Sequence, residues 1–297
     1  MSAPISAPLP TRLSIRDLFY ILAIMLVWGV NFPVAKLGVA AVPPLFLLAL
    51  RFAIVGLLVI PFFPRPRRQW GWLLLLSGML GVVHFGVLFF ALRSVDSALA
   101  AVLIQAQVPF STLLGIVILK ERPSRITLIG MAIALVGVAI VFGEPHGPSS
   151  ALAAGLVVFA AFVWSCSNLV SKRLTSLHPL AMTGWMALLT APQLALLSFF
   201  LETGQIEALA TGGWIAAGTL AYMIFGATLF AYGGWYTLMQ RYPLSTLSPY
   251  ALTAPIFGVF ASVIALGEPF TLKAAFGAAL TLGGVGLLTL VRRPPKV

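Results

Sequence analysis

The chain has 297 residues, of which 60% are hydrophobic and only 8% are charged, and its mean hydropathy is +1.05. Soluble globular domains carry about 25% charged residues, so this composition excludes one. Because lipid offers the backbone no hydrogen bonds, a membrane-embedded chain must form helices or a closed barrel. The apolar runs here are continuous rather than alternating. We therefore predict an all-α integral membrane protein that has no room for a soluble catalytic domain.

In chain order, apolar runs of about 20 residues, the length that crosses a bilayer, predict ten transmembrane helices. Their expected spans are 18–40, 44–62, 70–92, 97–119, 125–142, 150–171, 179–200, 213–238, 245–266 and 271–291. The first run lacks a small-residue cleavage site, so we interpret it as an uncleaved helix rather than a signal peptide. The single cysteine, Cys166, excludes an intramolecular disulfide and a cysteine-rich metal site. No metal or cofactor is expected.

The formal net charge of +11 could indicate nucleic-acid binding, but the positions of the basic residues favour another interpretation. With the N-terminus inside, three basic residues fall on the outer side: Lys36, Arg93 and Lys273. Fourteen fall on the inner side: Arg12, Arg16, Arg65, Arg67, Arg68, Lys120, Arg122, Arg125, Lys172, Arg173, Arg241, Arg292, Arg293 and Lys296. This is the positive-inside bias of a multi-pass membrane protein. We predict both termini in the cytoplasm, a bacterial inner-membrane location and no nucleic-acid partner.

The two halves of the chain carry the same pattern. The run Trp28–Lys36 recurs 136 residues later as Trp164–Lys172, with Trp, Val and Lys at matching places. Further along, a Glu and two Gly residues recur at an offset of 147, as the pairs Glu121 and Glu268, Gly130 and Gly277, Gly137 and Gly284. A sustained offset indicates a duplicated unit, and five crossings per copy would invert the second copy. We therefore predict two inverted five-helix repeats, 15–143 and 150–291, around a central cavity, as in many secondary transporters.

Four sequence segments are weak motifs singly but together are specific for one family of membrane proteins. They are Trp28-Gly29-Val30-Asn31-Phe32, Leu50-Arg51-Phe52, the stretch from Pro109 to Leu119-Lys120-Glu121-Arg122 with Gly130 and Gly137, and Gly267-Glu268-Pro269 with Gly277 and Gly284. Together they resemble EamA-type members of the drug/metabolite transporter superfamily, over nearly the whole chain. The resemblance implies ten helices in two inverted repeats that export amino acids, drugs or other metabolites. The overall character is most similar to the bacterial aromatic amino-acid exporters of that superfamily.

Four polar side chains are expected at one depth. At a rise of about 1.5 Å per residue, Asn31 lies about 20 Å from the inner end of its span, and Arg51, His84 and Gln105 lie about 12 Å from the outer ends of theirs. In a hydrocarbon core about 30 Å thick they form one layer, which predicts a lined substrate cavity. His84 either hydrogen-bonds substrate or ties neighbouring helices together as a neutral imidazole. Arg51 could bind a carboxylate, but we favour a structural charge that binds backbone carbonyls.

Aromatic and amide side chains complete the predicted substrate site. Trp28 with Asn31, and Trp164 with Asn168, each share a helix face. The repeat places both tryptophans near the midplane, away from the membrane interfaces where tryptophan is common. They could flank an apolar or aromatic side chain of the substrate, or fill the bundle core. Further candidates are Tyr222, near the middle of the eighth span, and Tyr250.

Two prolines interrupt the fourth and ninth spans at repeat-related positions. Pro109 and Pro255 each remove a backbone N–H and free a carbonyl one turn earlier, at Gln105 and at Ala251. We predict a kink at each proline, and we predict that both act as hinges.

Residues near the ends of the spans receive ordinary interpretations. The acidic pair Glu121 and Glu268 is expected to be solvated and partly paired rather than to couple transport to an ion, and the basic pair Lys36 and Lys172 is expected to extend toward the membrane surface. An interfacial aromatic belt is expected from Tyr232, Trp235 and Tyr236.

The leading functional hypothesis is alternating-access export of small zwitterionic or apolar metabolites, chiefly neutral and aromatic amino acids. All seven acidic residues lie outside the predicted spans or at their ends. Because ion-driven transporters usually carry a buried carboxylate, we expect facilitated transport, with a proton-coupled drug or metabolite antiporter as the alternative. A membrane enzyme is less favoured, because there are no paired carboxylates and no clustered Asp, His or Cys ligands. Expected partners are the small-molecule substrate and membrane lipid, and the protein is expected to be a monomer or homodimer.

Overall fold

The computed structural model describes residues 13–66, 68–120, 124–142, 148–174, 176–242, 247 and 250–290. Every regular element in these ranges is helical. In chain order the elements are α1 (Ile15–Ala41), α2 (Pro44–Val59), η1 (Ile60–Phe62), α3 (Trp70–Leu76), η2 (Ser77–His84), α4 (Phe85–Ala91), α5 (Ser97–Leu103), η3 (Ile104–Ala106), α6 (Gln107–Leu119), α7 (Arg125–Phe142), α8 (Pro148–Ser171), η4 (Lys172–Leu174), α9 (Pro179–Leu201), α10 (Gln205–Thr211), α11 (Gly213–Ala221), η5 (Tyr222–Phe230), α12 (Ala231–Arg241), α14 (Thr253–Leu266) and α15 (Leu272–Leu290).

Most of these helices are apolar on the outside of the bundle as well as inside it. Eight described segments are long and apolar enough to cross a membrane, and two shorter apolar helices cover Thr253–Leu266 and Leu272–Leu287. Large apolar side chains face outward, such as Leu57 at 65% and Phe199 at 75% exposure. An apolar surface of this extent requires lipid rather than water as its solvent. The protein is therefore an all-helical, multi-pass membrane protein, as the composition predicts.

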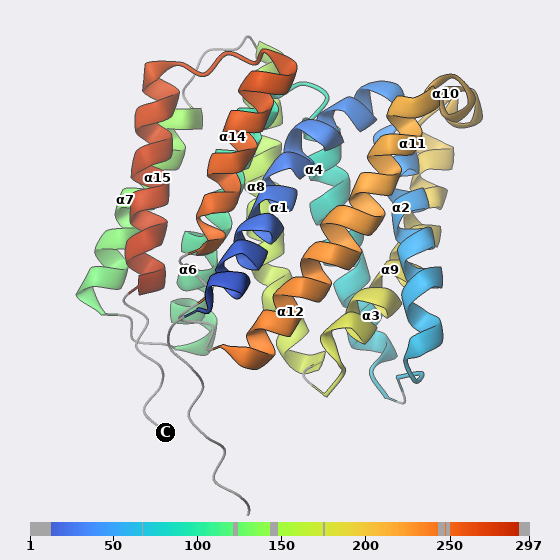
Figure 1. Ribbon diagram of the computed structural model, residues 1–297, viewed down its shortest axis with the longest axis horizontal. Helices are drawn as coiled ribbons and strands as arrows, with labels where there is room; N and C mark the ends of the chain where they lie inside the picture. The colour runs from blue at the N-terminus through green and yellow to red at the C-terminus, as the bar shows by residue number, and fades with distance from the viewer. Residues whose placement is uncertain are drawn as a thin grey trace, which may run out of the picture.

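The helices run alternately up and down between the two ends of the bundle (Figure 1). The upper end in this view carries α10 and is called the α10 end; the opposite end carries the start of α3 and is called the α3 end. α1 starts at the α3 end, and α15 finishes there. Several observed bounds match the predicted spans closely, as in Pro44–Phe62 and Arg125–Phe142.

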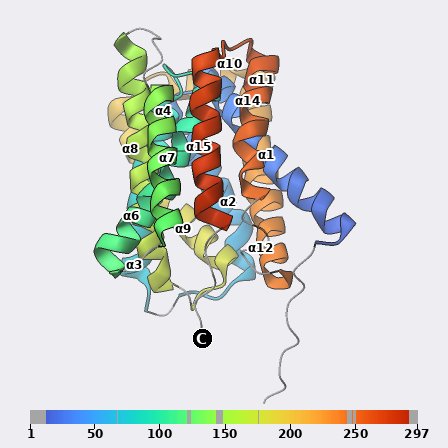
Figure 2. The same ribbon diagram turned by 90° about the vertical axis from the view of Figure 1, so that its left-hand side faces the viewer.

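Helices from the two halves of the chain pack against each other. α1 packs against α14 and α6 against α8, while α2 packs against α9 and α7 against α15 (Figures 1 and 2). Glycines permit these close approaches. A Cβ added to Gly29 would lie 2.7 Å from the backbone nitrogen of Gly258, and one added to Gly137 would lie 2.6 Å from the carbonyl oxygen of Gly277. Small residues at crossing points are the usual way for membrane helices to gain packing contact.

The fourth and ninth spans are both interrupted, as the two prolines predict. Between α5 and α6 the chain tightens into the 3₁₀ turn Ile104–Ala106, and the turn residue Leu252 separates a preceding helical stretch from α14. A buried proline, Pro109 or Pro255, follows each interruption by about one turn. The breaks are thus present at repeat-related places, while hinge motion at these prolines stays a prediction.

Two π-helical segments lie at related places in the two halves, and the sequence pattern does not predict them. η2 joins α3 to α4, and η5 joins α11 to α12. In η5 the hydroxyl of Thr228 donates to the carbonyl of Met223, five residues earlier, at 2.7 Å. The side chain thereby supplies a hydrogen bond where the wider helical turn disturbs the regular backbone ladder. Because π segments occur often at functional sites, these two direct attention to the middle of the bundle.

Candidate functional site

An aromatic cluster surrounds Trp28 in the middle of α1. Its indole Nε1–H donates to the carbonyl of Ala227 in η5 at 3.1 Å. Its ring packs on Tyr232 and Trp235, with centroid distances of 5.2 and 5.7 Å. The interfacial belt expected from these two residues is wrong, because α12 packs against α1 and turns their rings onto Trp28. The side chain of Tyr236 lies outside the described part of the structure.

Arg51, in α2, is only 4% exposed and reaches across to η5. Its Nη2 donates to the hydroxyl of Thr228 at 3.1 Å. The guanidinium carbon lies 5.6 Å from the ring centroid of Phe52 and 5.4 Å from that of Phe85, in cation–π range. Its Nε and Nη1 are buried without a hydrogen-bond partner. The expectation that backbone carbonyls satisfy this charge is wrong, since the one bonded nitrogen pairs with a hydroxyl.

His84 ends η2 and joins it to α8. Its Nδ1 lies 2.8 Å from the carbonyl oxygen of Ala160, and its ring packs on Phe85 and Trp164 at 4.7 and 5.1 Å. The side chain is 3% exposed. These contacts agree with the interpretation in which the imidazole ties helices together, and they also place the histidine directly against Trp164, one of the predicted walls of the site.

These contacts form one continuous path through the middle of the bundle, which we call the central path. It is made of Trp28, Ala227, Thr228, Arg51, Phe85, His84 and Trp164. The two repeat-related tryptophans lie at its ends. Both π segments contribute to it, η5 through Ala227 and Thr228 and η2 through His84. Arg51 and His84, two members of the predicted polar layer, both contact Phe85, and the layer itself stays a prediction.

The other predicted residues are less connected. The Oδ1 of Asn31 is buried without a partner, and Gln105 is 8% exposed within the 3₁₀ turn between α5 and α6. The Tyr222 hydroxyl donates to the carbonyl of Val27 at 2.8 Å, which ties η5 to α1. Asn168 and Tyr250 are half-buried. The structure thus brings only some of the predicted substrate-binding residues into contact with one another. Binding of substrate by these residues stays a prediction.

A buried carboxylate closes the α10 end between α5 and α14. Glu268 is 8% exposed and accepts hydrogen bonds from the backbone N–H groups of Ser97 and Ala98, at 2.9 and 2.8 Å. The Nζ of Lys36 lies 3.8 Å from this carboxylate and donates to the carbonyl of Val95. The first amides of a helix lack internal partners and attract negative charge. The expectation of a solvated Glu268 is therefore wrong, although the carboxylate is paired as expected, in this case with Lys36. Glu121 lies outside the described residues.

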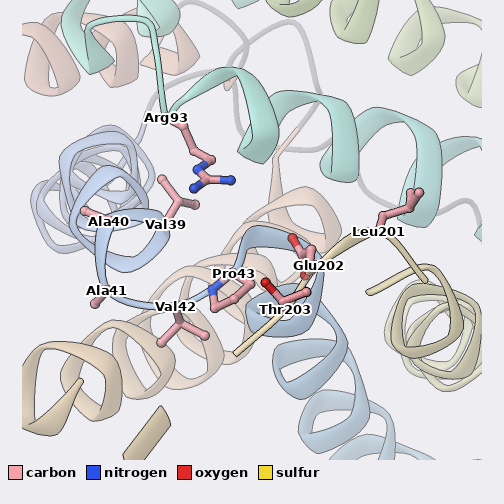
Figure 3. A pocket seen from close by; sticks show the side chains of 9 residues that line it. All are labelled: Val39, Ala40, Ala41, Val42, Pro43, Arg93, Leu201, Glu202 and Thr203. Atoms are coloured by element: carbon pink, nitrogen blue, oxygen red, sulfur yellow. The ribbon is translucent and has the colours of Figure 1, made fainter. Parts of the chain in front are cut away.

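Cavities are found at both ends of the bundle. At the α10 end, Glu202 accepts hydrogen bonds from the backbone N–H groups of Leu45 and Phe46, at 2.9 and 3.1 Å. It lines a cavity of about 260 Å³ into which Arg93 extends from the opposite side (Figure 3). At the α3 end, a cavity of about 530 Å³ is lined by Arg65, Trp70 and Trp185 among others. Neither cavity includes a residue of the central path, so these two openings are separate from it.

The chain is similar to known transporters along its whole length. The profile of the EamA-like transporter family matches residues 16–143 and, a second time, residues 151–290. A "Probable amino-acid metabolite efflux pump" of Salmonella typhimurium is 32% identical over 297 residues, which is 96% of this chain and 99% of the relative. The protein with the same name in Escherichia coli is 31% identical over 282 residues, covering 92% and 94% of the two chains.

More distant relatives extend the same similarity. An "Uncharacterized transporter" of Bacillus subtilis is 25% identical, covering 95% of this chain and all of the relative. A solved structure titled "Crystal structure of protein" has a TM-score of 0.64 at 21% identity and covers 94% of this chain and 98% of the other. At that identity the structural match shows the shared fold and nothing more.

Proposed function

The chain belongs to the EamA-like transporter family, and we propose that it exports small metabolites, chiefly neutral and aromatic amino acids, across the bacterial inner membrane by alternating access. Membrane transport is the function that relatives along the entire chain share by name. The names of two of them specify efflux of amino-acid metabolites. Those names support a transporter rather than an enzyme, and they motivate the choice of amino acids.

We also propose that the transporter consists of two inverted five-helix repeats, 15–143 and 150–291, with ten crossings. Three observations support this arrangement. The family profile matches the chain twice. Helix contacts come in related pairs, since α1 packs on α14 as α8 packs on α6. The π segments and the breaks before Pro109 and Pro255 also recur at nearly constant separation. Because helix direction alternates, a five-helix unit repeated in this way is inverted.

The orientation follows from the charges. The loops at the α3 end carry basic residues such as Arg65, Arg68, Arg125 and Arg173, and such an excess marks the cytoplasmic side. We therefore place the α3 end and both termini in the cytoplasm and the α10 end outside. The capping of α5 by Glu268 at the α10 end favours a state that is closed on the outer side.

The observation that carries the proposal is the central path from Trp28 to Trp164. It places aromatic rings, a histidine and an arginine in the middle of an otherwise apolar bundle. A small-molecule site typically combines apolar walls with a few polar anchors. In our proposal the substrate binds beside this path, with Asn31, Gln105, Asn168, Tyr222 and Tyr250 contributing as helices rearrange. Pro109 and Pro255 provide the bending points for that rearrangement.

The driving force is proposed to be the substrate gradient alone. The described acidic residues, Asp17, Asp96, Glu202, Glu207 and Glu268, all lie near helix ends, where they are poorly placed to carry protons through the membrane. A proton-coupled antiporter is the alternative, and His84 is then the coupling group because it is the titratable residue within the central path. Uptake driven by a pH gradient alone, and lost in His84→Ala, would favour this alternative.

Counterflow in proteoliposomes tests the proposed function. Purified protein is reconstituted with a high internal concentration of an unlabelled amino acid, and the entry of the labelled amino acid is followed for a panel of neutral, aromatic and charged species. We expect accelerated exchange for neutral and aromatic members. His84→Ala, Asn31→Ala and Gln105→Ala should slow it at normal membrane abundance. An absence of counterflow for the whole panel overturns amino-acid export, and wild-type rates in all three variants overturn the site.

A further inference from the structure

Arg51 is a permanent positive charge in the middle of the bundle. It lies seven residues after the first residue of α2, Pro44, which corresponds to about 10 Å along the helix axis. It is 4% exposed, and an arginine side chain does not release its proton in proteins. The charge is therefore held in a region that excludes both water and lipid headgroups.

The hydrogen-bonding capacity of this guanidinium is mostly unused. One nitrogen, Nη2, bonds the hydroxyl of Thr228, and that hydroxyl gives its own proton to Met223. The two remaining nitrogens, Nε and Nη1, are buried and have no partner. The rings of Phe52 and Phe85 stabilise the charge through their π faces, but they cannot accept the N–H bonds in the plane of the guanidinium.

The described acidic residues do not neutralise Arg51. Asp17 bonds Ser14 and Tyr242 at the α3 end, and Glu202 and Glu268 cap α2 and α5 at the α10 end. Asp96 and Glu268 lie within ion-pair distance of Lys36, and Asp17 lies within ion-pair distance of Arg241. A buried charge with unpaired hydrogen-bond donors strongly destabilises the folded protein. A protein that retains such a charge is therefore expected to use the free donors in its function.

We propose that Arg51 binds the carboxylate of the transported substrate through one edge of its guanidinium. Nη2 donates one of its two protons to Thr228, and its second proton lies parallel to an N–H of an unpartnered nitrogen, Nε or Nη1. A carboxylate can accept two parallel hydrogen bonds from such an edge. The inference rests on the proposed transport function and specifies how that site recognises its substrate. In the structure this edge of the guanidinium is shielded from solvent, and the substrate reaches it when α2 and η5 move apart.

The same surroundings define the class of substrate. Arg51 is the one permanently charged residue of the central path, so it balances a single negative charge, as in a monocarboxylate. A phosphate or a dicarboxylate would bring a second charge that the described residues of this region do not compensate. Phe52, Phe85 and Trp28 supply apolar and aromatic surface nearby. The matching ligands are α-amino acids or related carboxylates with an apolar or aromatic side chain.

Competition binding tests this proposal. The full-length protein in lipid nanodiscs is titrated with labelled L-phenylalanine and L-leucine, each in competition with its own α-carboxamide, which replaces the carboxylate by a neutral group of similar size. In the wild type we expect the acids to bind at least about tenfold more tightly than the amides. In Arg51→Gln the ratio of the two affinities should fall to within about twofold of one. Arg125→Gln removes an exposed charge at the α3 end and should leave the ratio unchanged.

Each outcome is decisive. An unchanged preference for the acids in folded Arg51→Gln overturns the carboxylate contact, and so does a wild type that binds acids and amides equally while amino-acid export itself stands. If neither acids nor amides bind to the wild type, the proposed function and this inference both fail. Should Arg51→Gln not remain monodisperse, Arg51→Lys provides the second variant. Because it keeps the charge but loses the paired donors, the affinity ratio should fall to an intermediate value, and a wild-type ratio would contradict the proposal.

Discussion

Glu268 caps the helix that Ser97 begins: its carboxylate accepts hydrogen bonds from both the backbone N–H and the hydroxyl of Ser97, at 2.9 and 3.0 Å. The carboxylate follows α14 and the serine starts α5, so the contact joins the two halves of the chain at the α10 end. A helix start offers N–H groups without internal partners. The contact satisfies these groups and joins α5 to the chain segment after α14 at the α10 end.

Replacing this carboxylate should open the α10 end. Glu268→Gln keeps the shape but loses the negative charge, and its amide oxygen can accept only one of the N–H bonds from Ser97 and Ala98 because the amide nitrogen is a donor. We expect a loss of about 1.5–3 kcal/mol from the closed arrangement, the usual range for hydrogen bonds to a charged group. Spin-label distances across the α10 end should lengthen. Glu207→Gln, at an exposed site on nearby α10, is the matched control, and equal distances in both variants would contradict the capping role.

The glycine contact between α7 and α15 should not tolerate a methyl group. A Cβ at Gly137 would lie 2.6 Å from the carbonyl oxygen of Gly277, and the facing atoms are backbone that cannot rotate away. Gly137→Ala should therefore lower the melting temperature in detergent. Gly218 in α11 has open space around its Cβ direction, so Gly218→Ala should leave it unchanged or slightly raised. Similar melting temperatures for the two variants would contradict the prediction, because they would show that α7 and α15 can move apart at little cost to accommodate the methyl group.

Topology is tested by cysteine accessibility. In a Cys166→Ser background, Pro66→Cys at the α3 end should react with impermeant reagents only after the cell membrane is opened. His146→Cys, which lies outside the described residues, should react in intact cells. A cysteine added after Val297 should behave like position 66. Labelling of the C-terminal cysteine from outside would reverse the positive-inside assignment and contradict the even number of crossings.

The two prolines should act on conformational exchange. Pro109→Ala and Pro255→Ala each restore a backbone N–H near a break in the fourth or ninth span, which should stiffen the helix there. Spectroscopic distances should then show a changed balance between inward- and outward-facing states, with a smaller change in equilibrium binding. If the distance distributions of both variants equal that of the wild type, the prolines are static kinks.

Much of the architecture was predictable because it depends on local composition. Apolar stretches must find lipid or each other, so their lengths and order give helical spans close to the observed ones, such as Arg125–Phe142. Proline lacks an N–H wherever it occurs, so weak points near Pro109 and Pro255 could be predicted from residue type. Packing decides whether the helix breaks, since Pro33 and Pro192 lie inside the continuous helices α1 and α9. The proposed orientation likewise depends on counting basic residues in loops, which requires no knowledge of packing.

The contacts that define the candidate site depended on tertiary structure. Helical spacing indicates which residues share a face, but not which helix that face meets. It therefore misplaced Tyr232 and Trp235 at the membrane interface. A carboxylate at a helix end is normally solvated, and only the approach of α5 makes Glu268 a buried cap. The π-helical segments were not predicted, because their wider turns depend on helix packing and on hydrogen bonds such as the one from the Thr228 hydroxyl to the Met223 carbonyl. Sequence alone thus determined that Arg51 lies within the membrane, whereas the surrounding helices decided that two of its nitrogens have no partner.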